Sequence, residues 1–259
     1  MNVPTMAEMK AQGKQPEVLF WVGSAGSYDD RAKKITRAFV KILQQAKVDF
    51  AVLGVEESST GDAAKRVGNE FLFQMQAMTN IALLNEYEVK TIVTCDPHSF
   101  NTIKNEYPSL GGKYEVFHHT QFITKLVNDG RLTIQNEKLK GKRLTFHDPC
   151  YLGRGNGVYE SPRDIIRKLG VNLTEMKRNK KSALCCGAGG GQMFKEPEKG
   201  NKDINILRTE DAIETKPEII ATGCPYCNTM MTDGVKFKEK ETQIVVKDIA
   251  ELIAEANSL

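Results

Sequence analysis

The sequence lacks any long hydrophobic run. No apolar stretch approaches the ~18 residues that a membrane-spanning helix needs, and residues 1–17 lack the apolar core of a signal peptide. Charge of one sign is also scarce, because 36 Lys and Arg residues against 33 Asp and Glu residues leave a net charge of +3. Such a balance creates no strong field for nucleic acid or for an anionic membrane. We therefore expect a cytoplasmic protein with no nucleic-acid partner and no direct membrane insertion, associated with a membrane only through partner subunits.

Two common redox signatures are missing as well. The chain has no Cys-x2-Cys-x2-Cys-x3-Cys-Pro ferredoxin motif and no G-x-G-x-x-G dinucleotide fingerprint. Any electrons that this chain handles must therefore come from another polypeptide. Cysteine itself is sparse, with six in 259 residues. In the cytoplasm thiols stay reduced, so clustered cysteines indicate metal or redox chemistry rather than structural disulfides.

Apolar segments with strand and helix patterns alternate along the chain. Continuous apolar runs indicate strands buried on both faces, whereas 29–48 and 69–88 have the longer pattern of helices. The Met and aromatic residues of FLFQMQAM, 71–78, are at helical spacing, and we expect most of them in the core. Strand–helix–strand alternation predicts an α/β fold with parallel sheets and covering helices. The expected strands are 17–23, 50–54, 89–94, 114–120, 143–148, 172–176, 217–223 and 244–249.

Five of the six cysteines lie in the second half of the chain, in three groups. Cys150 is followed after 34 residues by Cys185-Cys186-Gly187, and after 36 more by Cys224-Pro-Tyr-Cys227. Each group follows a predicted strand or its connecting loop. Because loops after parallel strands gather at one edge of a sheet, we expect the five thiols to converge. Thiolates select zinc, copper(I) or iron–sulfur clusters.

The glycines after the cysteine pair favour the binding of a metal ion or an inorganic cluster at this edge. Gly187 and residues 189–191 let the backbone approach closely and supply amide donors. A thioredoxin-like pair would use two cysteines and leave three idle, and a zinc ribbon has two Cys-x-x-Cys knuckles and four ligands. CGAGGG could be a nucleotide-phosphate loop, but Gln192 stands where a third glycine belongs. An iron–sulfur cluster is the favoured interpretation, with zinc as the alternative.

The pattern Cys-x34-Cys-Cys-Gly-x36-Cys-x2-Cys resembles the cysteine-rich CCG domain, which is found in the cysteine-rich subunit of heterodisulfide reductase and in iron–sulfur subunits of glycolate and lactate oxidation. The resemblance covers nearly the whole chain, from FWVGSAGSYDDRAKKI to DIAELI. It implies a pair of domains, each able to hold a non-cubane [4Fe–4S] cluster on five cysteines. In heterodisulfide reductases two facing clusters cleave a disulfide substrate. Carried over, the ligands of one cluster are Cys150, Cys185, Cys186, Cys224 and Cys227.

The first half of the chain repeats the second without its cysteines. Ser24 follows a strand as Cys150 does, and at matching intervals the chain has Ser59-Thr60-Gly61 and then Asp96-Pro-His-Ser99. Hydroxyl groups are poor ligands for iron at neutral pH. We therefore expect two similar lobes, 1–130 and 131–259, related by a pseudo-two-fold axis with their motif loops facing a shared cleft. The cluster site should be intact in the second lobe and degenerate in the first, at Ser24, Ser59, Thr60, Asp96 and Ser99.

Further residues near these motifs have two interpretations each. His147, Asp148, Gly187 and Tyr226 are candidate donors to the cluster or to its ligands, or they cap and pack strand ends. Cys95 is one residue out of register with Asp96, so we expect it buried outside the site. His118 and His119 are neighbours on a predicted strand and should therefore point to opposite faces.

The sequence is consistent with two functions. The first is an iron–sulfur electron-transfer subunit with one non-cubane [4Fe–4S] cluster, working with a ferredoxin-like iron–sulfur subunit, a flavoprotein subunit, or both. It would belong to an oxidoreductase complex of the heterodisulfide reductase or 2-hydroxy-acid oxidation type, since disulfide cleavage in the family uses two facing clusters and this chain would hold one. The second is a non-enzymatic scaffold or sensor in which zinc or a cluster serves stability.

Overall fold

The structure is a computed structural model that describes residues 3–189, 191–196 and 199–259. Its strands form two parallel sheets of four strands each. The first sheet has the order β2-β1-β3-β4 and the second has the order β6-β5-β7-β8. The strands are β1 (Val18–Trp21), β2 (Phe50–Ala51), β3 (Thr91–Thr94), β4 (Glu115–His118), β5 (Arg143–Phe146), β6 (Asn172–Leu173), β7 (Ile219–Thr222) and β8 (Val245–Asp248).

Helices follow the strands in the same order in both halves. The predicted α/β class with two lobes of one topology is thus confirmed, although the boundary at residues 130 and 131 stays a prediction. The helices are α1 (Met6–Ala11), α2 (Gly23–Tyr28), α3 (Ala32–Gln45), α4 (Asp62–Arg66), α5 (Glu70–Glu86), α6 (Pro97–Asn101), α7 (His119–Asn128), α8 (Glu160–Lys168), α9 (Ile204–Glu214), α10 (Pro225–Phe237) and α11 (Ile249–Ala256). By chain order α3, α5, α6 and α7 correspond to α8, α9, α10 and α11.

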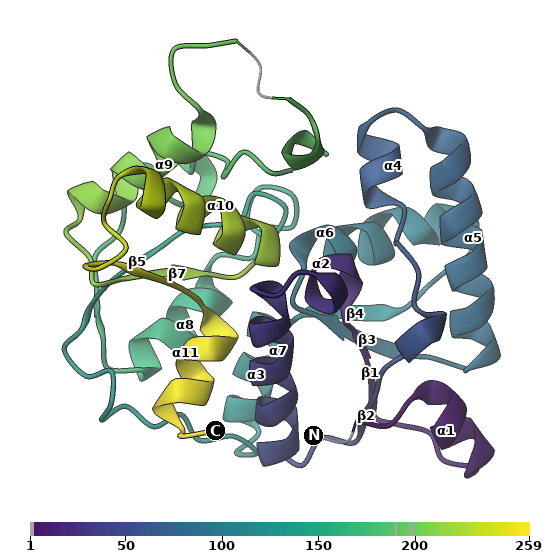
Figure 1. The fold of residues 1–259 in the computed structure, drawn as a ribbon. Helices are drawn as coiled ribbons and strands as arrows, with labels where there is room; N and C mark the ends of the chain where they lie inside the picture. Colours follow the sequence, from purple (N-terminus) through teal and green to yellow (C-terminus); the bar gives the residue numbers. More distant parts are fainter. Residues whose placement is uncertain (1–2, 190, 197–198) are drawn as a thin grey trace.

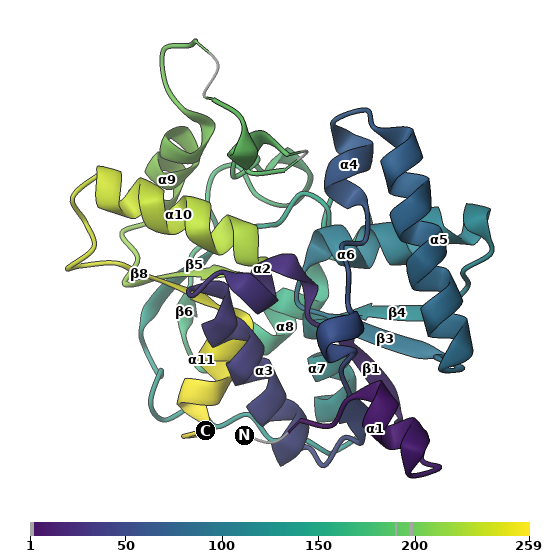
Figure 2. The ribbon, with the colours of Figure 1, turned by 45° about the vertical axis from the view of Figure 1, so that its right-hand side comes forward.

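The two lobes meet through equivalent helices. Helices α3, α7, α8 and α11 lie between the sheets, as Figures 1 and 2 both show. Helix α3 packs on α11, and α8 packs on α7. Because α3 corresponds to α8 and α11 to α7, exchanging the lobes maps one contact onto the other, which is how a two-fold axis relates two halves. The sequence repeat is therefore a repeat of structure, and it brings the two motif edges to the same side.

Side chains that alternate between the two faces of a strand belong to two different hydrophobic clusters. In β1, Val18 and Phe20 belong to the cluster that joins the lobes, whereas Leu19 and Trp21 pack on the outer face under α5. Successive side chains of a strand point to opposite faces, and here both faces are covered. A strand covered on both faces must be apolar throughout, which is why β1 reads as a continuous hydrophobic run.

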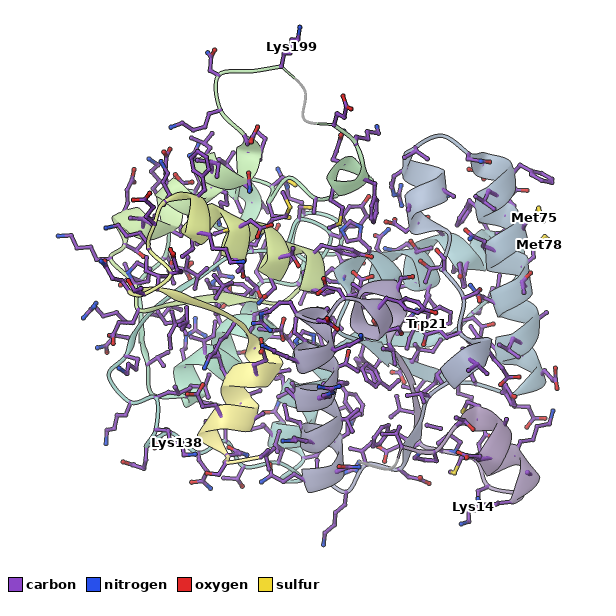
Figure 3. The ribbon with its side chains drawn as sticks, in the orientation of Figure 1. Lys14, Trp21, Met75, Met78, Lys138 and Lys199 are labelled. Atoms are coloured by element: carbon purple, nitrogen blue, oxygen red, sulfur yellow. The ribbon has the colours of Figure 1, made fainter. Side chains whose placement is uncertain are left out.

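The surface of α5 corrects one expectation. Phe73 and Ala77 are buried, but Phe71, Met75 and Met78 are exposed by 74%, 52% and 60%. Met75 and Met78 project from the outer side of the helix in Figure 3. The expectation that the Met and aromatic residues of 71–78 lie mostly in the core is therefore wrong. Helical spacing identified one buried stripe correctly but could not show that the opposite side of the helix is apolar as well.

Candidate metal centre

The five cysteines of the second lobe come from three segments at one edge of its sheet. Cys150 lies just beyond β5, Cys185 and Cys186 lie in the long connection after β6, and Cys224 and Cys227 follow β7. Cys224 is the residue before the first turn of α10, and its sulfur accepts the backbone N–H of Cys227 at 3.5 Å. A sulfur in that place satisfies a helix N–H and holds the Cys-x-x-Cys pair in a fixed geometry. Parallel strands thus deliver all three segments to the same place.

Their sulfur atoms lie close together. The Sγ atoms of Cys186 and Cys227 are 3.3 Å apart, and Cys185 and Cys224 pack in the same cluster of side chains. Cys186, Cys224 and Cys227 are buried, whereas Cys150 and Cys185 are partly exposed. A group of thiols of this size, shielded from water on one side, can surround a small inorganic body.

The neighbouring thiols shift the pKa values of one another. Hydrogen bonds from the thiols of Cys150 and Cys186, with the backbone N–H of Gly187, hold the pKa of Cys185 far below its ordinary value. The pKa values of Cys150, Cys186 and Cys227 are raised by their thiol neighbours and by burial. Without a bound metal, most of these thiols therefore favour the neutral form. Metal ligation needs several thiolates at once, and a bound cation supplies the charge that permits them.

His147 is a buried imidazole whose Nε2 has no hydrogen-bond partner in the described part of the chain. Its Nδ1 accepts a hydrogen bond from Nε of Arg208 at 2.9 Å. Because a guanidinium can only donate, Nδ1 carries no proton, and the neutral ring carries its proton on Nε2. Burial, followed by the charge of Arg208, lowers the pKa of His147 to about 3 and keeps the ring neutral.

The imidazole of His147 lies beside the cysteines. One ligand atom each from His147, Cys186 and Cys227 lie within 4.8 Å of one another. A buried donor left without a partner among protein groups costs free energy, and a sulfur-rich body held by these cysteines would accept its hydrogen bond. The chemistry of this set of residues therefore fits an iron–sulfur cluster, with His147 as donor rather than as ligand.

The other residues near the motifs have different positions. Asp148 makes a bidentate ion pair with Arg163 at 2.7 and 2.9 Å and accepts the backbone N–H of Lys180, so it fixes the connection that leads to Cys185. The backbone N–H of Gly187 donates to the sulfur of Cys185 at 3.3 Å, with φ at +94°. Of the glycines after it, residue 190 lies outside the described residues.

The degenerate positions of the first lobe also converge. Ser24, Ser59, Thr60, Asp96 and Ser99 all line one cavity of about 130 Å³. Ala188, Gly191, Met193, Phe194 and Tyr226 of the second lobe line the same cavity. The two motif edges thus face a shared cleft, as the repeat predicts. No cysteine is among the described residues that line it, and Cys95 is buried in the core between the lobes.

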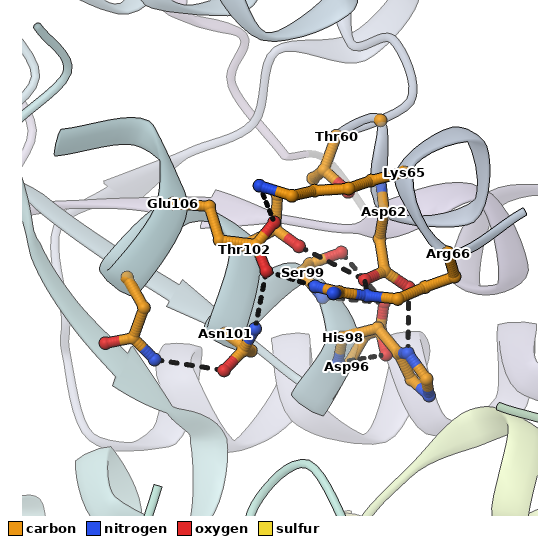
Figure 4. A network of polar contacts seen from close by, with 12 residues as sticks. Thr60, Asp62, Lys65, Arg66, Asp96, His98, Ser99, Asn101, Thr102 and Glu106 are labelled. Atoms are coloured by element: carbon orange, nitrogen blue, oxygen red, sulfur yellow. Dashed lines mark hydrogen bonds and ion pairs between the residues drawn. The ribbon is translucent and has the colours of Figure 1, made fainter. Parts of the chain in front are cut away.

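A polar network that the sequence did not reveal supports one wall of this cavity (Figure 4). Nδ1 of His98 lies 2.9 Å from a carboxylate oxygen of Asp62, and Nε of Arg66 donates to the other oxygen at 3.0 Å. Arg66 is also paired with Glu106. Burial opposes a charge on His98, but the bond to Asp62 and the charge of Asp96 outweigh it and raise the pKa of His98 to about 9. The only signal in the sequence was the position of His98 inside the DPHS segment that aligns with CPYC.

The two adjacent histidines differ from expectation. His118 ends β4 and His119 begins α7, so the alternation of a strand does not apply, and their ring centres are 4.3 Å apart. The statement that they point to opposite faces is wrong. Nε2 of His118 donates to the carbonyl of Gly223, directly before Cys224, and Nε2 of His119 lies 3.0 Å from Asp248. Both bonds connect the first lobe to the second, and the bond from His118 fixes the turn that leads to Cys224.

The model of the CCG cysteine-rich domain matches the chain twice, at residues 18–104 and 144–232. The chain belongs to this family. Each match contains three of the four strands of one sheet, β1 to β3 in the first and β5 to β7 in the second, so the family model covers the degenerate half as well as the half that carries the cysteines. The repeat inferred from the spacing of the motifs is thus a repeat of the family domain.

Several named proteins align with most of this chain. It is 50% identical to the probable iron-sulfur-binding oxidoreductase FadF of Bacillus subtilis, over 98% of this chain and 36% of that protein. It is 44% identical to the EtfAB:quinone oxidoreductase of Syntrophomonas wolfei, over 94% of this chain and 35% of that protein. It is also 34% identical to one subunit of the dihydromethanophenazine:CoB–CoM heterodisulfide reductase of Methanosarcina barkeri, over 94% of this chain and 59% of the relative.

The chain thus spans only about a third to three fifths of the length of these relatives. Among solved structures, glutamate racemase of Bacillus anthracis aligns over 93% of this chain and 79% of its own, with 12% identity and a TM-score of 0.36, which is too low to support an inference. No helix in the described ranges is both long and apolar enough to cross a membrane.

Proposed function

We propose that this chain is the electron-transfer part of an iron–sulfur oxidoreductase and holds one non-cubane [4Fe–4S] cluster on Cys150, Cys185, Cys186, Cys224 and Cys227. The observation that carries the proposal is the convergence of sulfur atoms from three separate segments, with Cys186 and Cys227 in contact. The relatives named as iron–sulfur oxidoreductases support the same chemistry. When bound, a cluster of this kind accepts and donates single electrons at a potential set by its surroundings.

The protein's own residues set those surroundings. The thiolates bind iron, the Gly187 N–H stabilises the charge on Cys185, and the Nε2–H of His147 donates toward the sulfur-rich centre. Donors to sulfur and exclusion of water are the usual means by which a protein adjusts the potential of a cluster. Arg208 acts through His147, because it fixes which nitrogen carries the proton.

Electrons should arrive from, and leave to, other polypeptides or domains. We infer a ferredoxin-like iron–sulfur subunit, a flavoprotein subunit, or both, because the chain has neither the ferredoxin motif nor a dinucleotide fingerprint. One cluster rather than two follows from the first lobe, whose corresponding positions offer hydroxyl and carboxyl groups. We also propose that the chain acts in a complex, in the cytoplasm or at a membrane through partner subunits, rather than as an enzyme alone.

The rival function is a scaffold or sensor with structural zinc. Protein purified without oxygen should be brown, should lose visible absorption on reduction with dithionite, and should then give an electron paramagnetic resonance signal. The Cys186→Ser variant should lose both the colour and the signal, because a thiolate ligand is replaced by a poor one. Cys95→Ser is the matched control and should keep both. A colourless protein with one bound zinc would establish the rival, and equal loss in the two variants would refute the assigned ligands.

A further inference from the structure

Arg208 is a fully buried arginine of α9 beside the candidate metal centre, and its side chain is 0% exposed. The first turn of α9 lies against the segment that carries the cysteine pair, because a Cβ on Gly187 would lie 3.6 Å from the backbone nitrogen of Asn205. Side chains of a helix lean toward its N-terminus. An arginine one turn further along α9 therefore leans back toward the cysteine pair, and the bond from Arg208 to His147 agrees with this direction.

Two of the three guanidinium nitrogens of Arg208 have hydrogen-bond partners. Nε donates to Nδ1 of His147 at 2.9 Å, and Nη1 donates to the backbone carbonyl of Arg178 at 2.6 Å. Nη2 is buried as well, but it has no hydrogen-bond partner among the residues that the structure describes. Because buried donors are nearly always paired, Nη2 indicates an acceptor that those residues do not provide.

The planar geometry of the guanidinium fixes the direction of this donor. Nε and Nη2 share one edge of the group, as in Arg163, where these two nitrogens bind the two carboxylate oxygens of Glu175. In Arg208 the same edge faces His147. One ring nitrogen of His147 lies within 4.8 Å of the Sγ atoms of two proposed ligands. The unpaired N–H of Arg208 is therefore on the side of the cysteines.

The positive charge of Arg208 shares its counter-ion with other cations. Asp211 is the one carboxylate that forms an ion pair with Arg208 in the described part of the chain, at 3.4 Å. Arg178 binds the same carboxylate at 2.7 and 2.6 Å, and Lys177 lies 3.5 Å from it. One buried carboxylate thus serves three cations. Burial without full compensation makes a charge costly, so the surroundings of Arg208 favour further negative charge.

Thiolates around a metal supply both things that Arg208 lacks. Their sulfur atoms accept hydrogen bonds, and they carry negative charge. Burial lowers the pKa of Arg208 against the opposing charge of Asp211, but a guanidinium keeps its proton throughout the pH range in which proteins are folded. The charge and the N–H donor of Arg208 are thus permanent.

We propose that Arg208 is a direct donor to the metal centre, with its Nη2–H directed to the sulfur atoms there and its charge raising the reduction potential. The inference deepens the proposed function and rests on it for the role in electron transfer. Reduction adds one electron, and hence one negative charge, to the centre. The electron comes from a partner subunit, or from dithionite in the test. A fixed positive charge beside the centre stabilises the reduced form more than the oxidised form.

Redox titration of protein purified without oxygen tests the effect of the charge. Arg208→Gln removes the charge but keeps a polar N–H group. It should make one-electron reduction at least tenfold less favourable, which is a shift of about 59 mV to lower potential. Arg208→Lys keeps the charge, and its potential should lie between those of Arg208→Gln and the parent protein. An unchanged potential in folded, iron-containing Arg208→Gln would refute the proposal, as would equal shifts in the two variants.

Arg178→Gln is the matched control for Arg208→Gln. It removes one positive charge from the same Asp211 carboxylate, but the Arg178 side chain is 33% exposed, so water and salt screen its charge. The equilibrium constant for reduction should change by less than about twofold. A shift as large as that of Arg208→Gln would show that the general charge around Asp211 sets the potential. That result would overturn the assignment of a direct donor.

Cobalt(II) provides a readout that depends neither on iron nor on electron transfer. Added to iron-free protein, it should bind the cysteine thiolates and give a thiolate-to-cobalt charge-transfer absorption band. A donor to a thiolate lowers the energy of the sulfur electrons and so shortens the wavelength of this band. The band should therefore move to longer wavelength in Arg208→Gln and should keep its position in Arg178→Gln. An unmoved band in Arg208→Gln would contradict a direct donor.

A measurement on the parent protein keeps the test decisive if Arg208→Gln does not fold. The parent is prepared with isotope-labelled arginine and loaded with cobalt(II), which is paramagnetic. Its nuclear magnetic resonance spectrum should then contain a guanidinium N–H signal shifted by the metal, and Arg208→Lys should lack this signal. If no arginine signal is shifted, water rather than the metal centre accepts the hydrogen bond from Nη2, and the proposal is overturned.

Iron content separates this inference from the proposed function. It is measured on the same proteins, purified without oxygen. Absence of iron refutes the proposed function, whereas the cobalt band and the arginine signal still decide whether Arg208 donates to the centre. Failure of the parent protein to bind cobalt(II) would show that the cysteines hold no metal and would refute both.

Discussion

Replacing His98 by glutamine should remove a pH dependence of stability that the parent protein shows between about pH 6.5 and pH 9. Burial disfavours the charged ring, but the Asp62 carboxylate and the charge of Asp96 raise the pKa of His98 from 6.5 to about 9. A difference of this size corresponds to about 3 kcal/mol in favour of the protonated folded state. The lowered pKa of Asp62 describes the same interaction and is not added to it.

The direction of the effect follows from linkage. Because the pKa is higher in the folded than in the unfolded state, the stabilisation is complete below pH 6.5, falls as the pH rises, and is lost above pH 9. The groups that face His98 are Asp62 and Arg66 of α4, Asp96 before α6, Tyr151 beyond β5, and Cys224 and Tyr226 at the start of α10.

Chemical denaturation of the parent and of His98→Gln at a series of pH values gives the difference in their free energies of unfolding. Subtracting the two proteins removes the contribution of other groups that titrate nearby, such as Glu57, whose pKa burial raises to about 7 against the hydrogen bonds from Val22 and Gly23. We expect the difference to shrink by about 3 kcal/mol between pH 6 and pH 10. A difference that is constant with pH would show that His98 is not charged in the folded protein, and the reasoning about its bond to Asp62 would be wrong.

Three further changes test other parts of the structure. His147→Phe should retain iron but lower the reduction potential by about 50 mV or more, because a hydrogen bond toward sulfur is lost; an unchanged potential in a redox titration would contradict its role as donor. Gly234→Ala should destabilise the fold by roughly 1–3 kcal/mol, since its Cβ would lie 2.0 Å from Oγ1 of Thr209, and a parent-like melting temperature would refute that packing. Phe71→Ser should change stability by less than about 0.5 kcal/mol, whereas Phe73→Ala should cost about 3–5 kcal/mol; similar losses would contradict the exposure of Phe71.

The parallel sheets were predictable because their strands carry a strong local signal. The run that forms β1 is apolar on both faces and ends at Gly23, and the interval from Ser24 to Ser59 repeats that from Cys150 to Cys185. Once the strands are parallel, the meeting of their following loops is a consequence of topology. The grouping of the cysteines could therefore be expected without knowledge of any distance.

Other features depend on contacts that no local pattern encodes. Helix α10 begins at Pro225, and Cys224 occupies its capping position. Cysteine is not among the common capping residues, so the sequence does not predict this helix. The apolar pattern of 114–120 predicts a strand through His119, whereas His118 and Gln121 form the reciprocal capping pair that starts α7. His98 and Asp62 are separated by 36 positions, so their pairing appears only when the motif loops of the first lobe fold together.

The central claim is that the second lobe holds one cluster and the first lobe holds none. Iron and acid-labile sulfide per chain, measured on protein purified or reconstituted without oxygen, test it most directly. We predict about four irons per chain, with the same value in Ser24→Ala and Ser59→Ala, because hydroxyl groups at the degenerate positions are poor ligands for iron. About eight irons in the parent, or loss of iron in either serine variant, would contradict the claim and show that the first lobe also holds a metal centre.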